Sequence, residues 1–200
     1  MQTLKADVEE KIREAAIRIF LKTGYELSST RRIVEAAEVS KGNLYNYFKS
    51  KEELFYAITT PFHESFNRFL RAITEHEEPE IFSEENTDRM AADVGKFIRE
   101  NRREFIIILD RSGGTRYADY KDEVIDCLKT HFEKSIKQEF KASSREGMSI
   151  MQIVAVNFVE ALLKIAKCKM RDEEMVHIIS LYLKFHANGV TRFYPQASSS

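Results

Sequence analysis

Apolar side chains recur every three to four residues along most of this chain, which is the spacing of amphipathic helices. The clearest stripe lies near the N-terminus, at positions i, i+3, i+4, i+7 and i+8, and consists of Ile12, Ala15, Ala16, Ile19 and Phe20. Gly24 follows, and glycine is common where a helix ends in a left-handed residue. The pattern therefore predicts a first helix that ends near Gly24 and buries one face.

Serine residues mark the starts of the next three predicted helices. A serine hydroxyl accepts a hydrogen bond from an unpaired amide of the first turn, so serine favours the N-cap position. The candidates are Ser28 or Ser29 for the second helix, Ser40 for the third and Ser50 for the fourth. Ser50 also begins a Ser-x-x-Glu capping box. Pro61 predicts a kink further along the fourth helix, because proline has no N–H to donate.

The rest of the chain completes an all-α prediction of about nine helices. Residues 75–85 are acidic and lack periodicity, which predicts a linker. Beyond it, apolar stripes predict helices over about 87–98, 101–109, 117–140, 150–166 and 175–185. The last two are apolar over most of their circumference, so they need burial on more than one side. We interpret them as a subunit interface, with a plain buried core as the alternative.

The bulk composition is that of an ordinary globular chain, with 43% apolar residues and a net charge of −1 over 200 residues. It shows no signal-peptide core and no apolar run of about 18 residues, so a cytoplasmic protein is expected. Cys127 and Cys168 stand apart from any cluster of metal-ligating residues. They are expected to be reduced and buried, with a redox-sensing pair as the alternative. No cofactor and no metal are predicted.

The charge balance between Lys22 and Lys51 differs from that of the whole chain, with six basic residues against three acidic ones. Because the total charge is near zero, any contact with DNA has to come from such a local patch. The patch is modest, so any DNA affinity is expected to depend on salt.

The segment from Val39 to Lys51 combines this charge with a helical pattern. Leu44 and Phe48 are four residues apart and predict a packed inner face. The outer face is expected to carry Lys41, Asn43, Asn46 and Tyr47, with Tyr45 at its edge. Such a helix suits a groove lined by phosphates and base edges. The alternative is an ordinary solvated helix.

A run of short motifs between about residues 8 and 56 carries a family pattern. They are Ile12-Arg-Glu-Ala-Ala16, Phe20, Thr23-Gly24-Tyr25, Ile33, Glu35-Ala36-Ala37, Val39-Ser40-Lys41-Gly42, Leu44-Tyr45, Tyr47-Phe48 and Ser50-Lys51-Glu52-Glu53-Leu54. Together they resemble the DNA-binding domain of TetR-family transcriptional regulators; beyond residue 60 the resemblance is architectural. It implies a homodimer, with a three-helix helix-turn-helix domain over 1–50 and a helical effector-binding and dimerisation domain over 51–200.

The resemblance also implies a set of DNA contacts. By position they are Ser29, Arg31, Arg32, Lys41, Gly42, Asn43, Tyr45, Asn46, Tyr47 and Lys51. Asn43 is the best candidate for a base edge, since an amide can pair with adenine. Tyr45, Tyr47 and Lys51 are expected to reach phosphates, and Gly42 to allow close approach of the backbone.

Two positions depart from the family pattern. Glu38 stands in the turn where the family usually has glycine. If it takes the left-handed conformation, strain of about 1 kcal/mol is expected; otherwise the turn has another geometry. Arg32 stands where an acidic residue often completes a capping box. A positive charge at a helix N-terminus lowers the stability by roughly 0.3–1 kcal/mol. A contact between Arg31 or Arg32 and a DNA phosphate would account for this choice.

The function implied by the resemblance is ligand-responsive regulation, with repression as the family's majority behaviour and release from a palindromic operator by a small molecule. An effector pocket is expected from aromatic residues, namely Phe62, Phe66, Phe97, Tyr117, Tyr120 and Phe158, for which plain core packing is the alternative. No catalytic motif is evident, so an enzyme is not expected. The competing interpretation is a helical dimer that binds a partner protein or ligand without DNA.

Overall fold

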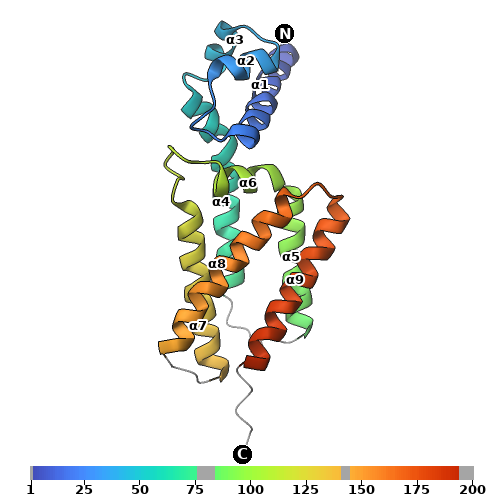
Figure 1. The fold of residues 1–200 in the computed structure, drawn as a ribbon. Coiled ribbons are helices and arrows are strands. Elements are labelled where there is room, and N and C mark those ends of the chain that lie inside the picture. Colours follow the sequence, from blue (N-terminus) through green and yellow to red (C-terminus); the bar gives the residue numbers. More distant parts are fainter. Residues whose placement is uncertain (1, 76–83, 141–144, 194–200) are drawn as a thin grey trace, which may run out of the picture. The chain divides into compact units, whose positions relative to one another are not determined.

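The computed structural model describes residues 2–75, 84–140 and 145–193, and over these ranges all regular secondary structure is helical (Figure 1). The helices are α1 (Gln2–Thr23), α2 (Thr30–Ala37), α3 (Lys41–Tyr47), α4 (Lys51–Thr74), α5 (Glu84–Glu100), α6 (Arg102–Asp110), α7 (Tyr120–Phe140), α8 (Arg145–Lys167) and α9 (Asp172–Phe193). The all-α prediction is confirmed. Most of the predicted linker, residues 76–83, lies outside the described residues.

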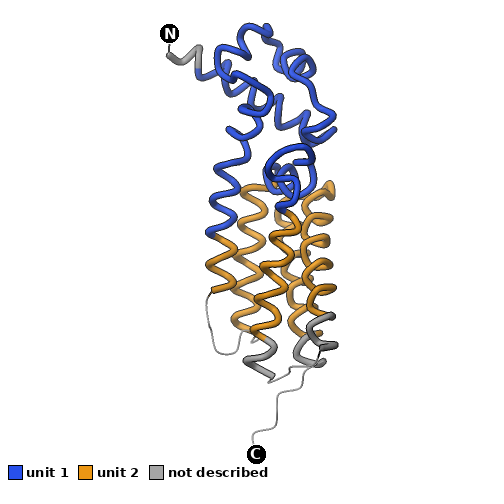
Figure 2. Tube along the Cα trace, turned by 90° about the vertical axis from the view of Figure 1, so that its left-hand side faces the viewer, with its two compact units in different colours: residues 1–68, 103–120 blue, residues 69–102, 121–200 orange. Residues whose placement is uncertain are grey.

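The chain folds as two compact units (Figure 2). Unit 1 comprises residues 1–68 and 103–120, and unit 2 comprises residues 69–102 and 121–200. Helix α4 contributes to both, and α6 belongs with the N-terminal helices although it follows them by many residues in sequence. The functional division predicted at residue 50 stays a prediction.

The core of unit 1 is built on the N-terminal stripe. Ile12, Ala15, Ala16 and Phe20 are fully buried, while Ile19 is half-buried at the margin. The Phe20 ring meets that of Phe55 edge to face, with ring centroids 5.2 Å apart. These apolar contacts hold α1 against α4 and supply a rigid base for α2 and α3.

Helix α6 is tied to α1 by polar contacts as well. The Arg103 guanidinium donates to both carboxylate oxygens of Glu14 at 2.7 Å, a bidentate ion pair that lowers the pKa of Glu14. Gly24 has φ 75°, and the next amide, that of Tyr25, donates to the carbonyl of Arg111 at 2.8 Å. The predicted left-handed glycine after α1 is confirmed, and it directs the chain onto the end of α6.

Helix α7 begins later than the sequence pattern predicts. Tyr117 lies in a series of hydrogen-bonded turns, and the helix starts at Tyr120. The amides of Thr115, Ala118 and Tyr120 each donate to the carbonyl three residues earlier, as in tight turns. Tyr117 is buried, with its ring against those of Tyr56 and His63 of α4, so its apolar character reports burial rather than helical periodicity.

Cys127 and Cys168 are free thiols and both are exposed. The expectation that they are buried is therefore wrong. On α7 the buried apolar positions around it include Val124, Ile125 and Leu128, and Cys127 falls beside this stripe rather than within it.

Unit 2 is a bundle in which α5 lies along α9 (Figure 1). Gly95 makes this approach possible, since a Cβ there would lie 3.0 Å from a methyl carbon of Val176. Helices α5, α7, α8 and α9 surround a small apolar cavity of about 70 Å³. Its lining includes Met90, Phe158 and two histidines, His131 and His186.

The two cavity histidines have defined hydrogen bonds. His131 Nδ1 lies 3.1 Å from the Thr74 carbonyl, which can only accept, so Nδ1 carries the proton. Tyr182 donates to the carbonyl of Asn157, so its oxygen accepts from Nε2 of His186 at 2.7 Å. Burial lowers the pKa of both imidazoles, although the Thr74 hydrogen bond partly opposes this for His131.

These shifts predict a loss of stability in mild acid. As the pH falls below about 6.5, the unfolded chain takes up protons before the folded chain does, so the free energy of unfolding decreases. Thermal melts at pH 7.5 and pH 5.0 should show a lower Tm at pH 5.0, and His131→Gln should reduce the difference. His177→Gln, at an exposed position of α9, is the matched control. An unchanged difference in His131→Gln would contradict this assignment.

Candidate nucleic-acid interface

Two serine caps define the starts of α2 and α3. Ser29 has extended backbone, and its hydroxyl accepts a hydrogen bond from the amide of Arg32 at 3.3 Å. Ser40 accepts from the amide of Asn43 at 3.1 Å. Of the two candidates for the first cap, Ser29 is therefore the correct one, whereas Ser28 is buried and bonds to the carbonyl of Tyr25. The two caps fix where the short helices begin.

The turn between α2 and α3 has the left-handed geometry that glycine usually provides. Glu38 has φ 55° and ψ 41°, and it is the one non-glycine residue with positive φ in the described part of the chain. Its amide donates to Glu35, and the amide of Val39 donates to Val34, the pattern of a Schellman motif. The first of the two alternatives for Glu38 therefore holds, and strain of about 1 kcal/mol is expected at this residue.

Helix α3 separates an inner face from an outer face as predicted. Leu44 and Phe48 are buried. Five of the predicted DNA contacts are exposed on this helix, and they are Lys41, Gly42, Asn43, Tyr45 and Asn46. Tyr47 is half-buried. The structure thus brings these predicted contacts together on one short helix.

The predicted contacts on α2 are also at the surface. Arg31 and Arg32 are exposed near the N-terminus of the helix, beside the Ser29 cap. The Arg31 guanidinium pairs with Glu35 one turn later at 2.8 Å, and both side chains remain largely exposed. An exposed pair of this kind contributes little to stability, so Arg31 can exchange Glu35 for another anion at low cost.

Lys51 lies differently from the other predicted contacts. Its ammonium donates to the carbonyls of Tyr25 and Ser28, at 2.8 and 3.0 Å, and lies 4.0 Å from the centre of the Tyr25 ring. Burial lowers the pKa of Lys51. An ammonium has three donors, so one remains for a phosphate. The sequence pattern did not reveal this clamp on the α1–α2 loop, because backbone carbonyls leave no trace in residue identity.

We expect Lys51→Met to destabilise the protein by about 1.5–3 kcal/mol, the usual range for hydrogen bonds to a charged group. The substitution keeps the apolar stem but removes both loop contacts. Thermal unfolding is the measurement, and Lys49→Met, two residues earlier at an exposed position, is the matched control. Equal melting temperatures for the two variants would contradict a clamp at Lys51.

The predicted effector residues fall into separate groups. Phe62, Phe66, Tyr117 and Tyr120 are buried in unit 1, where the Phe62 and Phe66 rings stack 5.4 Å apart. In unit 2, Phe97 stacks on Phe69 at 4.5 Å and lines an open groove of about 560 Å³, whereas Phe158 lines the small cavity described above. The prediction that the six form one pocket stays a prediction.

In the described ranges, no helix is long and apolar enough to cross a membrane. The same residues contain no group of three or more His, Cys, Asp or Glu side chains placed to hold a metal ion.

Comparison with known proteins points to one family. The profile described as "Bacterial regulatory proteins, tetR family" matches residues 12–58, which span α2, α3 and parts of α1 and α4. The transcriptional regulator QacR of Staphylococcus aureus is 46% identical over 52 residues, which cover 26% of this chain and 28% of QacR. The transcriptional repressor DhaR of a Mycobacterium species is 42% identical over 48 residues, 24% of each chain. The chain thus spans only about a quarter of the length of these curated relatives.

Likeness of fold extends over nearly the whole chain. A solved bacterial regulatory protein of the tetR family from Rhodococcus superposes with a TM-score of 0.60, covering 96% of this chain and 98% of that one at 20% identity. At this identity the likeness concerns the fold alone. The two curated relatives are described as a transcriptional regulator and a transcriptional repressor of the helix-turn-helix type. Over residues 12–58, the helix-turn-helix segment of this chain matches the TetR family of bacterial regulatory proteins.

Proposed function

We propose that this chain is a homodimeric transcriptional regulator that binds a palindromic operator through α2 and α3 and leaves it when a small molecule binds unit 2. Repression is the expected direction. The observation that carries the proposal is the outer face of α3, where exposed Lys41, Asn43 and Asn46 stand on a capped helix whose other face is buried. A helix of this kind can enter the major groove of DNA.

The roles within α3 follow from chemistry and exposure. We assign Asn43, in the first turn of α3, to a base edge, and Lys41 and Tyr45 to phosphates. The fold itself does not require glycine at position 42, since a Cβ there would meet only the Ser40 hydroxyl at an ordinary 3.7 Å. Its small size therefore supports close approach to DNA.

The dimer interface is proposed on α8 and α9. Several large apolar side chains on these helices are exposed in the single chain: Ile153 by 60%, Leu181 by 53% and Phe185 by 74%. Ile178 adds to this surface from α9. Exposed apolar side chains gathered on neighbouring helices favour association, and a second copy of the chain is the proposed partner.

The effector site is proposed at the cavity between α5, α7, α8 and α9. Its lining is apolar apart from a few polar side chains, including the two histidines with defined tautomers. Such a lining favours a mainly apolar molecule with a hydrogen-bonding group. The cavity volume of about 70 Å³ requires side chains to move as a larger molecule enters.

Selection of bound fragments from random duplex DNA tests the proposal. The purified protein should enrich a palindrome whose half-sites lie about one helical turn, roughly 34–36 Å, apart. Absence of enrichment, with a folded dimer in solution, would favour the alternative of a helical dimer that binds a partner protein or ligand without DNA.

A further inference from the structure

Pro61 leaves the carbonyl oxygen of Ala57 without its regular helical donor. In an α-helix this carbonyl would accept a hydrogen bond from the amide of residue 61, and proline has no N–H. Helix α4 nevertheless continues from Lys51 to Thr74 with Pro61 inside it. The Ala57 carbonyl is thus an acceptor available to another part of the chain.

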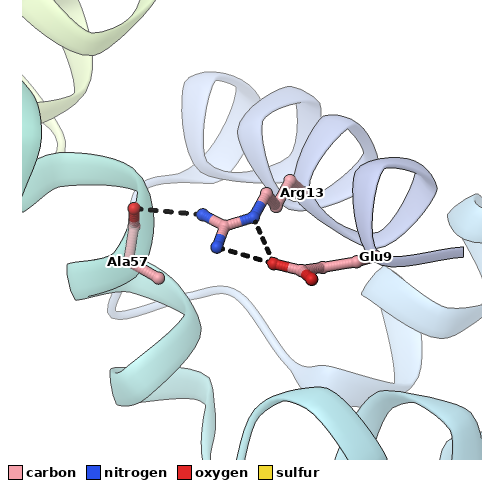
Figure 3. A network of polar contacts seen from close by, with 3 residues as sticks. All are labelled: Glu9, Arg13 and Ala57. Carbon is pink, nitrogen blue, oxygen red and sulfur yellow. Dashed lines mark hydrogen bonds and ion pairs between the residues drawn. The ribbon is translucent and has the colours of Figure 1, made fainter. Parts of the chain in front are cut away.

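Arg13 of α1 supplies a donor for this carbonyl (Figure 3). Its Nη1 donates to the Ala57 oxygen at 3.0 Å, while Nε and Nη2 donate to a carboxylate oxygen of Glu9 at 3.0 and 2.8 Å. Glu9 therefore holds the guanidinium in place from one side. The planar, rigid fork of arginine suits such a fixed set of acceptors better than a lysine ammonium does.

The same guanidinium also reaches the end of α3. Its central carbon lies 5.1 Å from the centre of the Phe48 ring. Phe48 is buried and is the C-cap residue of α3, where its amide donates to Leu44 at 2.9 Å. One side chain of α1 thus contacts both the end of α3 and the carbonyl that Pro61 leaves open in α4.

We propose that Arg13 is a positioning residue that fixes α3 relative to α4, and that Pro61 makes this possible by leaving the Ala57 carbonyl open. A displacement of α4 near Pro61 then reaches α3 through Arg13 and Phe48. The consequence for DNA rests on the proposed function, because it requires α3 to contact the operator. The contact itself can be tested without DNA.

The test is a double-mutant cycle with Arg13→Met and Pro61→Ala. Arg13→Met removes the donor but keeps an apolar stem, and Pro61→Ala restores an amide that can donate to Ala57 within α4. The four proteins are compared for Tm and for affinity to the palindromic duplex enriched by the wild-type protein. Arg18→Met is the matched control, since Arg18 donates from α1 to the Ala36 carbonyl of α2 at an exposed position.

Arg13→Met should lower the Tm by roughly 3–10 °C and the duplex affinity by about tenfold. Pro61→Ala should preserve or raise the Tm yet also weaken the duplex affinity, because it withdraws the acceptor from Arg13. In the double variant the Tm should recover toward the wild-type value, while the affinity stays near that of either single variant. If Arg13 had a purely structural role, the double variant would regain both its Tm and its duplex affinity.

Two results would overturn the proposal. One is a double variant whose loss of affinity equals the product of the two single losses. The other is a double variant that regains wild-type affinity along with its Tm. If the wild-type protein enriches no duplex, the proposed function fails and the role toward α3 fails with it. In that case the Tm values of the four proteins still test the contact between Arg13 and the Ala57 carbonyl. If the Tm shift of the double variant equals the sum of the two single shifts, that contact is refuted too.

Discussion

Replacing Lys41, Asn43 and Tyr47 together by alanine should weaken specific operator binding by about 100-fold or more. Asn43 is the proposed base contact, and one bidentate base contact is worth about 1–3 kcal/mol. Lys41 and Tyr47 are proposed to hold phosphates, and loss of the Lys41 charge should also reduce the dependence of affinity on salt. Titration of the selected duplex at several salt concentrations measures both effects.

The controls separate recognition from folding. Lys41 and Asn43 are exposed, so their loss should leave the Tm nearly unchanged. Tyr47 is half-buried, and Tyr47→Phe in the triple variant retains its ring while removing the hydroxyl. Leu44→Ala, in contrast, should destabilise by about 2–5 kcal/mol, because Leu44 is fully buried. A folded triple variant with undiminished operator affinity would refute the assigned DNA surface.

Leu181→Glu combined with Phe185→Glu should convert the proposed dimer into a monomer. Both side chains are more than half exposed in the single chain, so the charges disrupt association while the fold of the subunit is retained. Operator affinity should fall by about 100-fold or more, since two linked half-site contacts become one. Sedimentation analysis gives the mass, and circular dichroism gives the helical content.

A conservative pair of substitutions provides the control for the interface. Leu181→Met with Phe185→Leu keeps the surface apolar and should preserve both the dimer and operator binding. If the glutamate variant remains a dimer, the subunits associate through another surface. The proposed interface on α8 and α9 would then be wrong.

Local features of the fold were predictable where one residue determines the backbone around it. Ser40 caps α3, Gly24 takes positive φ after α1, and the N-terminal stripe is buried. Each of these depends on interactions within a few residues, which the sequence displays directly. The same holds for the two faces of α3, because helical periodicity separates Leu44 from Lys41.

Features that depend on distant backbone groups were not predictable from the sequence. The Lys51 ammonium donates to backbone carbonyls of the α1–α2 loop, and the Arg13 guanidinium donates to a backbone carbonyl of α4. Any residue can supply a carbonyl, so neither contact has a motif. Helical periodicity also predicted that Cys127 lies in the buried stripe of α7, but Cys127 is exposed. An error of one residue in the phase of a helix moves a side chain by about 100° around the axis, which is enough to take it out of a buried stripe.

The composition of unit 1 bears on the engineering of chimaeric regulators. A chimaera that joins residues 1–68 to a foreign effector domain would omit α6 and the turns after it, which belong to the same compact unit. Glu14 would lose Arg103, and the amide of Tyr25 would lose the Arg111 carbonyl. The compact unit that carries the proposed DNA surface therefore consists of two separate segments, and a functional graft has to rebuild the α6 surface in its new host.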